Sequence, residues 1–163
     1  MSNEIMQIAE MFLELKAKAA RGMTWTKDEQ AVVTMCFEKE GVARVLAACC
    51  VLSSGRPKGC IRSLGIVREA IEQEHPAPFV ELIIYEALTS VETSQLQAFS
   101  GAIVRFVEQS LKKRAISLDN TIFLLGKLAR VGEVAALVLL RSLAGDSESG
   151  VRNAAGVVLR GLP

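Results

Sequence analysis

Apolar residues recur at helical spacing along most of the chain, with charged residues between them. In the first segment Ile5, Ile8, Phe12 and Leu15 lie three or four positions apart, which places them on one face of an amphipathic helix. The stretch from Val42 to Leu52 is apolar nearly all round, so we expect a central helix covered on several sides. The pattern therefore predicts an all-α chain of about nine helices.

Local signals mark where these helices begin and end. Thr26 followed by Glu29 is a capping-box pair, and Gly22 is a natural stop for the preceding helix. Trp25, just before the cap, is expected to be a half-buried packing wedge. Pro57 suits the first turn of the fourth helix, and Ser117 suits an N-cap. The predicted helices cover 2–20, 42–52, 58–72, 79–89, 94–114 and 118–130, with two more inside 131–163. A further helix is predicted to begin at Thr26 and to be separated from the next one by Gly41.

The chain also resembles itself. Residues 82–107 align without gaps on 137–162, and a third copy lies at 46–68. Self-similarity at this length is typical of stacked helical hairpins, none of which can bury its apolar face alone. We therefore expect one domain, 1–163, forming a short right-handed α-solenoid of antiparallel hairpins. Its hairpins would be 42–73, 77–112 and 132–162, with an extra helix at 118–130.

The last copy resembles a known family. The run from Asp146 to Ala155, preceded by Leu140 and Leu143 and followed by Leu159, is similar to a HEAT repeat, most clearly over residues 132–162. The resemblance implies that the second helices line a concave side. It also implies that Asp146 and Arg152 belong to a ladder of Asp and Arg residues between hairpins. The upstream copies have Val91 with Gln97, and Gly55 with Ile61, at those two positions.

Composition and charge narrow the classes of partner. Half of the residues are apolar but only 5% are aromatic, which is typical of closely packed helices. The 19 basic and 18 acidic residues leave a net charge of +1, so no overall field attracts nucleic acid or an anionic membrane. The N-terminus lacks the pattern of a secretory signal. The apolar stretch from Val45 to Gly55 is shorter than the about 20 residues of a membrane helix. We expect a cytoplasmic protein without a membrane partner.

Cysteine, histidine and acidic residues do not form a recognisable catalytic or metal-binding set. The chain has no C-x-x-C pair, and His75 is its single histidine. Carboxylates spaced by two, such as Glu72 and Glu74, face different ways on a helix. We therefore predict no cofactor, no metal, no catalytic residue and no enzymatic activity. Four cysteines are expected to be buried free thiols: Cys36, Cys49, Cys50 and Cys60.

A stripe of glycine and arginine recurs on two predicted second helices. Glycine costs about 1 kcal/mol in a helix interior, so its reuse at Gly65, Gly101 and Gly156 needs a reason. Close approach of a neighbouring helix is the favoured reason, and a ligand lying across small residues is the alternative. The arginines point to a protein interface, where Arg is enriched. The candidate partner-binding residues are Arg68, Gln97, Gly101, Arg105, Arg152, Gly156 and Arg160.

The basic triplet 112–114 is interpreted as complementing a helix dipole rather than binding phosphate. These features together favour a non-enzymatic module that binds another protein on its concave face. Such a module could serve as an inhibitor, a toxin-neutralising (immunity) protein or a secretion or assembly adaptor. Two alternatives remain open: a HEAT-like enzyme that binds nucleic acid or modifies bases, and a homodimeric scaffold.

Overall fold

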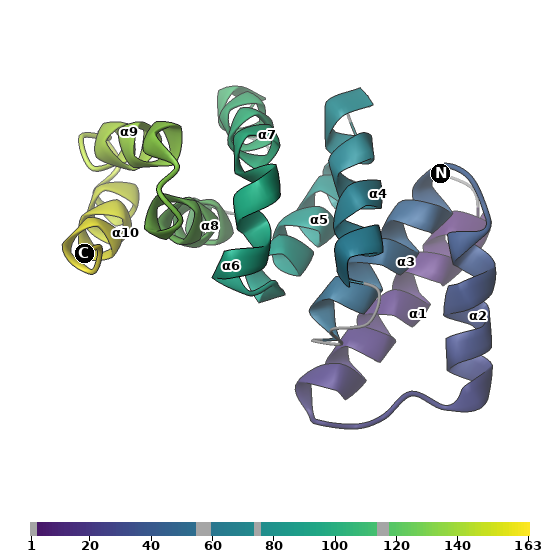
Figure 1. The fold of residues 1–163 in the computed structure, drawn as a ribbon. Helices are drawn as coiled ribbons and strands as arrows, with labels where there is room; N and C mark the ends of the chain where they lie inside the picture. The colour runs from purple at the N-terminus through teal and green to yellow at the C-terminus, as the bar shows by residue number, and fades with distance from the viewer. Residues whose placement is uncertain (1–2, 55–59, 74–75, 114–117) are drawn as a thin grey trace. The chain divides into compact units, whose positions relative to one another are not determined.

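A computed structural model describes residues 3–54, 60–73, 76–113 and 118–163 (Figure 1). All regular structure in these ranges is helical, which confirms the all-α prediction. The helices are α1 (Asn3–Ala20), α2 (Lys27–Phe37), α3 (Val42–Ser53), α4 (Cys60–Gln73), α5 (Pro78–Ser90), α6 (Thr93–Leu96), α7 (Ser100–Lys113), α8 (Leu118–Arg130), α9 (Val134–Leu143) and α10 (Ser149–Arg160). A short 3-10 helix, η1 (Gln97–Phe99), joins α6 to α7. The predictions for Gly55, Pro57, His75, Arg114 and Ser117 lie outside the described residues.

The chain divides into two compact units, Met1–Ser90 and Val91–Pro163, whereas the sequence predicts one domain. The boundary falls inside the predicted hairpin 77–112. We describe each unit by itself, and a solenoid running through the whole chain stays a prediction.

Helix α3 is the centre of the first unit. It contacts α1, α2, α4 and α5, as expected for a helix that is apolar nearly all round. Leu46, Ala47 and Ala48 are completely buried. An ion pair between Lys16 on α1 and Glu86 on α5 adds a polar link across the same unit.

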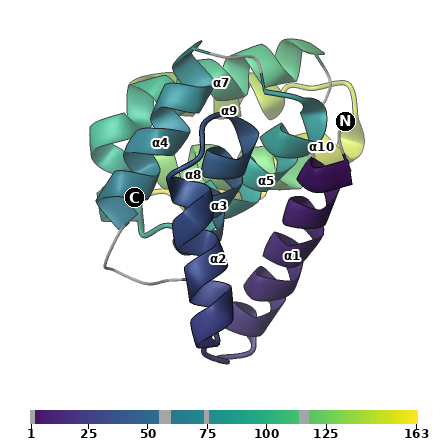
Figure 2. The same ribbon diagram turned by 90° about the vertical axis from the view of Figure 1, so that its right-hand side faces the viewer.

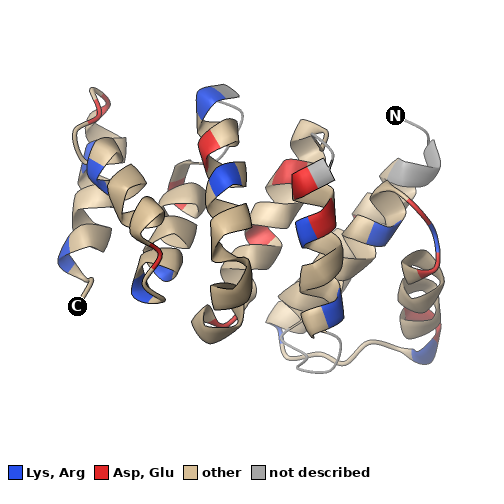
Figure 3. Ribbon diagram, turned by 45° about the horizontal axis from the view of Figure 1, so that its top comes forward, with Lys and Arg blue, Asp and Glu red and all other residues tan. Residues whose placement is uncertain are grey.

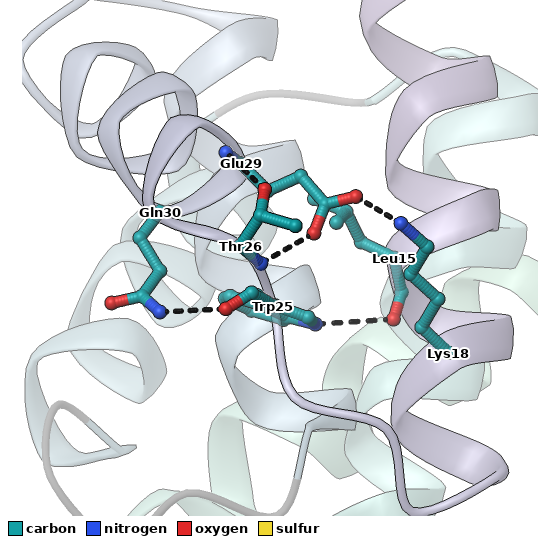
Figure 4. A network of polar contacts seen from close by, with 6 residues as sticks. All are labelled: Leu15, Lys18, Trp25, Thr26, Glu29 and Gln30. Atoms are coloured by element: carbon teal, nitrogen blue, oxygen red, sulfur yellow. Dashed lines mark hydrogen bonds and ion pairs between the residues drawn. The ribbon is translucent and has the colours of Figure 1, made fainter.

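Helices α1 and α2 run in opposite directions and converge at the turn between them (Figure 2). The chain between them is held by a polar network centred on Trp25 (Figure 4). The indole Nε1 of Trp25 donates to the carbonyl of Leu15 at 3.2 Å, and Gln30 Nε2 donates to the carbonyl of Trp25 at 2.8 Å. Trp25 is only 5% exposed, which confirms its prediction as a packing wedge, although it is more buried than expected.

The capping box beside Trp25 is also confirmed. The Thr26 amide donates to Glu29 Oε2 at 2.8 Å, and the Glu29 amide donates to Thr26 Oγ1 at 3.2 Å. Glu29 additionally pairs with Lys18 on α1. That hydrogen bond, together with the Thr26 amide, lowers the pKa of the Glu29 carboxyl. One glutamate therefore caps α2 and ties it to α1.

In the second unit, α7 to α10 form a four-helix arrangement. Helix α7 contacts α8 and α9, and α10 also contacts α8 and α9. Because α8 and α9 contact each other as well, α7 and α10 lie at opposite corners (Figure 1). The core contains the buried leucines Leu124, Leu125, Leu128 and Leu140.

Candidate functional site: a leucine-lined groove

A groove of about 540 Å³ opens in the second unit, within the size range of known ligand sites. It lies where the C-terminal ends of α7 and α9 meet the first residues of α8 and α10. We call it the α7–α9 groove. Its lining residues are Glu108, Ser110, Leu111, Lys112, Leu118, Leu139, Ser142, Leu143, Asp146, Ser147, Glu148 and Val151.

The walls of the groove are aliphatic. Leu139 and Leu143 are four residues apart, so both lie on the same face of α9. Leu111 on α7 and Leu118 at the start of α8 complete the leucines, and all four remain partly exposed. Val151 is buried. These leucines leave apolar area in contact with water, and covering it would be favourable by about 25 cal/mol for each Å².

The rim of the groove carries charges of both signs. Glu108 and Glu148 are exposed, and Asp146 is partly exposed. The only cation among the described lining residues is Lys112, whose Nζ lies 3.6 Å from Glu108 Oε1. The guanidinium of Arg152 lies beside the same turn, because it donates to the carbonyl of Asp146. Figure 3 shows acidic and basic positions towards the end of α7 and acidic positions in the turn before α10.

These carboxylates do not form a metal centre. Within the described ranges, no group of three or more His, Cys, Asp or Glu residues is placed so that it could hold a metal ion. The acidic side chains are instead spread around the opening of the groove.

The turn that closes one end of the groove is held by its own hydrogen bonds. Asp146 Oδ1 accepts from the Glu148 amide at 2.8 Å. Arg152 Nη1 donates to the carbonyls of Asp146 at 2.6 Å and Ser147 at 3.0 Å. Asp146 and Arg152 therefore both bond within this turn, and the HEAT-like ladder between hairpins stays a prediction.

Ser110 places a buried hydroxyl beside the leucines. Its side chain is 1% exposed, and its Oγ has no hydrogen-bond partner within the described part of the chain. A buried polar group without a partner costs about 1–3 kcal/mol. Ser63 on α4, in the first unit, is in the same state.

None of the seven residues predicted to bind a partner lines this groove. Arg68 lies on α4, where its Nε donates to Glu72 Oε2 at 3.1 Å. Gln97 lies in η1, where the tighter 3-10 winding displaces it from the face of Gly101 and Arg105. Because α7 and α10 lie at opposite corners, the structure does not bring Gly101 and Arg105 together with Arg152, Gly156 and Arg160. Partner binding by these residues stays a prediction.

The favoured explanation for the repeated glycines is wrong. A Cβ built on Gly65 would meet no atom of the described residues within 4 Å. On Gly101 and Gly156 it would meet only the guanidinium of the arginine four residues later, at 3.8 Å and 3.6 Å. The close approach occurs instead at Gly126 on α8, where a Cβ would lie 2.6 Å from Val158 Cγ1 on α10.

The predicted burial of the cysteines is confirmed. Cys36, Cys49, Cys50 and Cys60 are buried, and none of them forms a disulfide within the described residues. Burial, reinforced by the neighbouring Cys50, raises the pKa of the Cys49 thiol well above its ordinary value. These thiols are therefore poor nucleophiles in the folded unit.

Sequence reasoning missed the groove. Leu139 and Leu143 lie four residues apart on α9, but this spacing alone does not show that both stay partly exposed. Comparisons with protein-family models, with curated proteins and with solved structures found no match. No helix in the described ranges has both the length and the apolar character needed to cross a membrane.

Proposed function

We propose that this chain is a non-enzymatic module that binds another protein. The observation that supports the proposal most directly is the α7–α9 groove, where four partly exposed leucines face a common opening. Partly exposed apolar side chains that line one concavity are typical of recognition surfaces. The inhibitor, toxin-neutralising and adaptor roles suggested by the sequence all require such a surface.

The charge of the groove favours protein over nucleic acid as the partner. Three of the described lining residues are carboxylates and one is a lysine, whereas binding to nucleic acid depends on clustered Lys and Arg. Figure 3 shows basic and acidic residues interspersed along the helices.

The proposal is tested by recovering the tagged full-length protein from its native host and identifying what accompanies it. We expect a protein in stoichiometric amount. Stoichiometric nucleic acid would instead support the nucleic-acid alternative, and a self-dimer with no second protein would support the scaffold.

Two charge reversals then decide which surface binds. If Arg105→Glu combined with Arg160→Glu releases the partner, the arginine stripe binds it. If Glu108→Lys combined with Glu148→Lys releases it, the groove does. Circular dichroism of each variant checks that the fold is kept.

A further inference from the structure

We infer that two copies of this chain associate head to tail, with the exposed side of α1 in one copy packed on the exposed side of α9 in the other. The inference goes beyond the proposed function and does not depend on it. It concerns two helix faces, one in each compact unit, that leave aliphatic side chains in contact with water.

Helix α1 carries exposed aliphatic side chains on the side opposite to its core. Met6 is 45% exposed and Leu13 is 52% exposed, whereas Leu15 is buried. Leu15 follows Leu13 by two positions, or about 200° around the helix, so Leu13 points away from the core. The exposed carboxylate of Glu10 lies between Met6 and Leu13 on the same side, and that of Glu14 lies one turn further on. We call Met6, Glu10, Leu13 and Glu14 the α1 face.

Helix α9 has a face of the same kind in the second unit. Val134 is 70% exposed and Val138 is 58% exposed, and the two valines are four residues apart. Ala136 and Leu140, which follow them by two positions, are completely buried, so the valines lie on the opposite side of the helix. Arg141 is exposed and lies three residues after Val138. We call Val134, Val138 and Arg141 the α9 face.

The charges on the two faces are opposite in sign. Glu10 and Glu14 form no ion pair within the described residues, where the two lysines of α1 pair with carboxylates on α5 and α2. Arg141 is the only charged residue of α9 and forms no ion pair there either. The contrast extends over the whole units: residues 1–90 contain 10 basic and 12 acidic residues, and residues 91–163 contain 9 basic and 6 acidic. Electrostatic attraction therefore favours an α1 face on an α9 face over two identical faces.

The spacing of the two faces matches when the helices are antiparallel. Leu13 lies three residues after Glu10, and Arg141 lies three residues after Val138. Antiparallel packing therefore places Leu13 beside Val138 and Glu10 beside Arg141. Aliphatic contacts would then cover apolar area on both copies, and the charge pair would fix the register.

The turn after α9 also favours the antiparallel direction. It holds the carboxylates of Asp146 and Glu148, together with the guanidinium of Arg152, which donates to the carbonyl of Asp146. Parallel helices would bring Glu14 beside this turn, where it would be a third carboxylate. Antiparallel helices keep Glu14 one turn before Arg141 and away from those acidic groups, so like charges are not brought together.

A head-to-tail contact uses two different faces, so every copy in a pair keeps one free face. Such contacts produce rings where the rotation closes and open chains where it does not. One helix packed on one helix covers less area than the about 1,200 Å² of a stable interface. We therefore expect association that is weak, reversible and dependent on concentration.

The experiment is analytical ultracentrifugation of the purified full-length protein between about 10 μM and about 1 mM. We expect the average mass of the wild type to rise with concentration. Leu13→Glu and Val138→Glu should each abolish the rise, because each places a carboxylate in the aliphatic contact. A one-to-one mixture of these two variants should form a heterodimer and nothing larger, since each variant contributes its one intact face.

The charge pair is tested by reversal and exchange. Arg141→Glu should weaken association about tenfold, and adding Glu10→Arg to the same chain should restore most of the affinity. The matched control is Met35→Glu on α2, which places a carboxylate at a side chain that is 53% exposed but belongs to neither face. It should leave association unchanged, and circular dichroism checks that every variant keeps its fold.

A wild type that stays monomeric at all these concentrations would overturn the inference. Association that survives either Leu13→Glu or Val138→Glu, or a mixture of the two that stays monomeric, would overturn it as well. Recovery from the native host reports separately on the proposed function. A second protein in stoichiometric amount with a monomeric purified chain keeps that function and rejects the inference, whereas self-association with no second protein does the reverse.

Discussion

The contact between α8 and α10 makes a sharp prediction for Gly126→Ala. Alanine is favoured over glycine in a helix interior by about 1 kcal/mol, so the exchange stabilises where space allows. At Gly126 the new methyl group would lie 2.6 Å from Val158 Cγ1. The χ1 angle of valine is restricted in a helix, so Val158 cannot simply rotate away from the new methyl group. Removing the clash requires α8 or α10 to shift. Overpacking of this kind costs about 1–3 kcal/mol.

We therefore expect Gly126→Ala to lower the free energy of unfolding of the second unit by about 0–2 kcal/mol, which is the overpacking cost less the gain in helix propensity. Gly156→Ala on α10 is the matched control. It would meet only the flexible guanidinium of Arg160 at 3.6 Å, so it should stabilise by about 1 kcal/mol. In a Val158→Ala background, which removes the obstructing methyl groups, Gly126→Ala should also stabilise by about 1 kcal/mol.

The assay is urea unfolding followed by far-UV circular dichroism, with hydrogen exchange of peptides from α8 and α10 to assign the change to that contact. The coupling energy between positions 126 and 158 should be about 1–3 kcal/mol. If Gly126→Ala stabilises wild-type protein as much as Gly156→Ala does, α8 and α10 are not packed at this point. The four-helix arrangement of the second unit would then be wrong.

Three further changes test the turns. Glu29→Gln should reduce the loss of stability in acid, because the folded-state pKa of Glu29 lies below its ordinary value of 4.5. The ionised Glu29 carboxylate stabilises the folded state above pH 4.5, and this stabilisation is lost as the pH falls through the folded-state pKa. If the free energy of unfolding of the variant and of the wild type depends on pH in the same way, this prediction is wrong. Trp25→Phe, which loses the bond to Leu15, should destabilise the first unit by about 1–3 kcal/mol in urea unfolding. Arg152→Ala, which loses two main-chain bonds, should raise hydrogen exchange in residues 146–149, whereas Arg141→Ala on the exposed face of α9 should not.

Local signals in the sequence predicted local structure well. The capping box of Thr26 and Glu29 depends on residues three apart, so its pattern is complete in the sequence. The central place of α3 followed equally directly from its lack of a polar face. The short 3-10 segment at Gln97–Phe99 was not predicted, because the surrounding apolar spacing is that of one continuous helix.

The arrangement of helices in the second unit was harder to predict. Alignment of 82–107 on 137–162 treated α7 and α10 as equivalent and α8 as an extra helix. Periodicity shows which face of a helix is apolar, but it does not show which neighbour covers that face. The close contact between α8 and α10 occurs at Gly126. It is a single glycine without a counterpart in the aligned copies, so repetition in the sequence could not single it out.

The groove was missed for a related reason. Leu139 and Leu143 have the spacing of core residues, and only the positions of α7 and the following turn leave them partly exposed. The carboxylates of the rim combine Glu108 with Asp146 and Glu148, about 40 residues further along the chain. Such a juxtaposition depends on tertiary structure and has no short-range pattern.

The four buried thiols have a consequence for measuring the dynamics of this protein. All of them, and also Trp25 and Tyr85, belong to the unit Met1–Ser90. A thiol reagent can reach Cys49 only when that unit opens, so the rate of labelling reports the free energy of its opening. Tryptophan fluorescence observes the same half of the chain. Denaturation followed by either probe is therefore expected to miss a transition confined to Val91–Pro163.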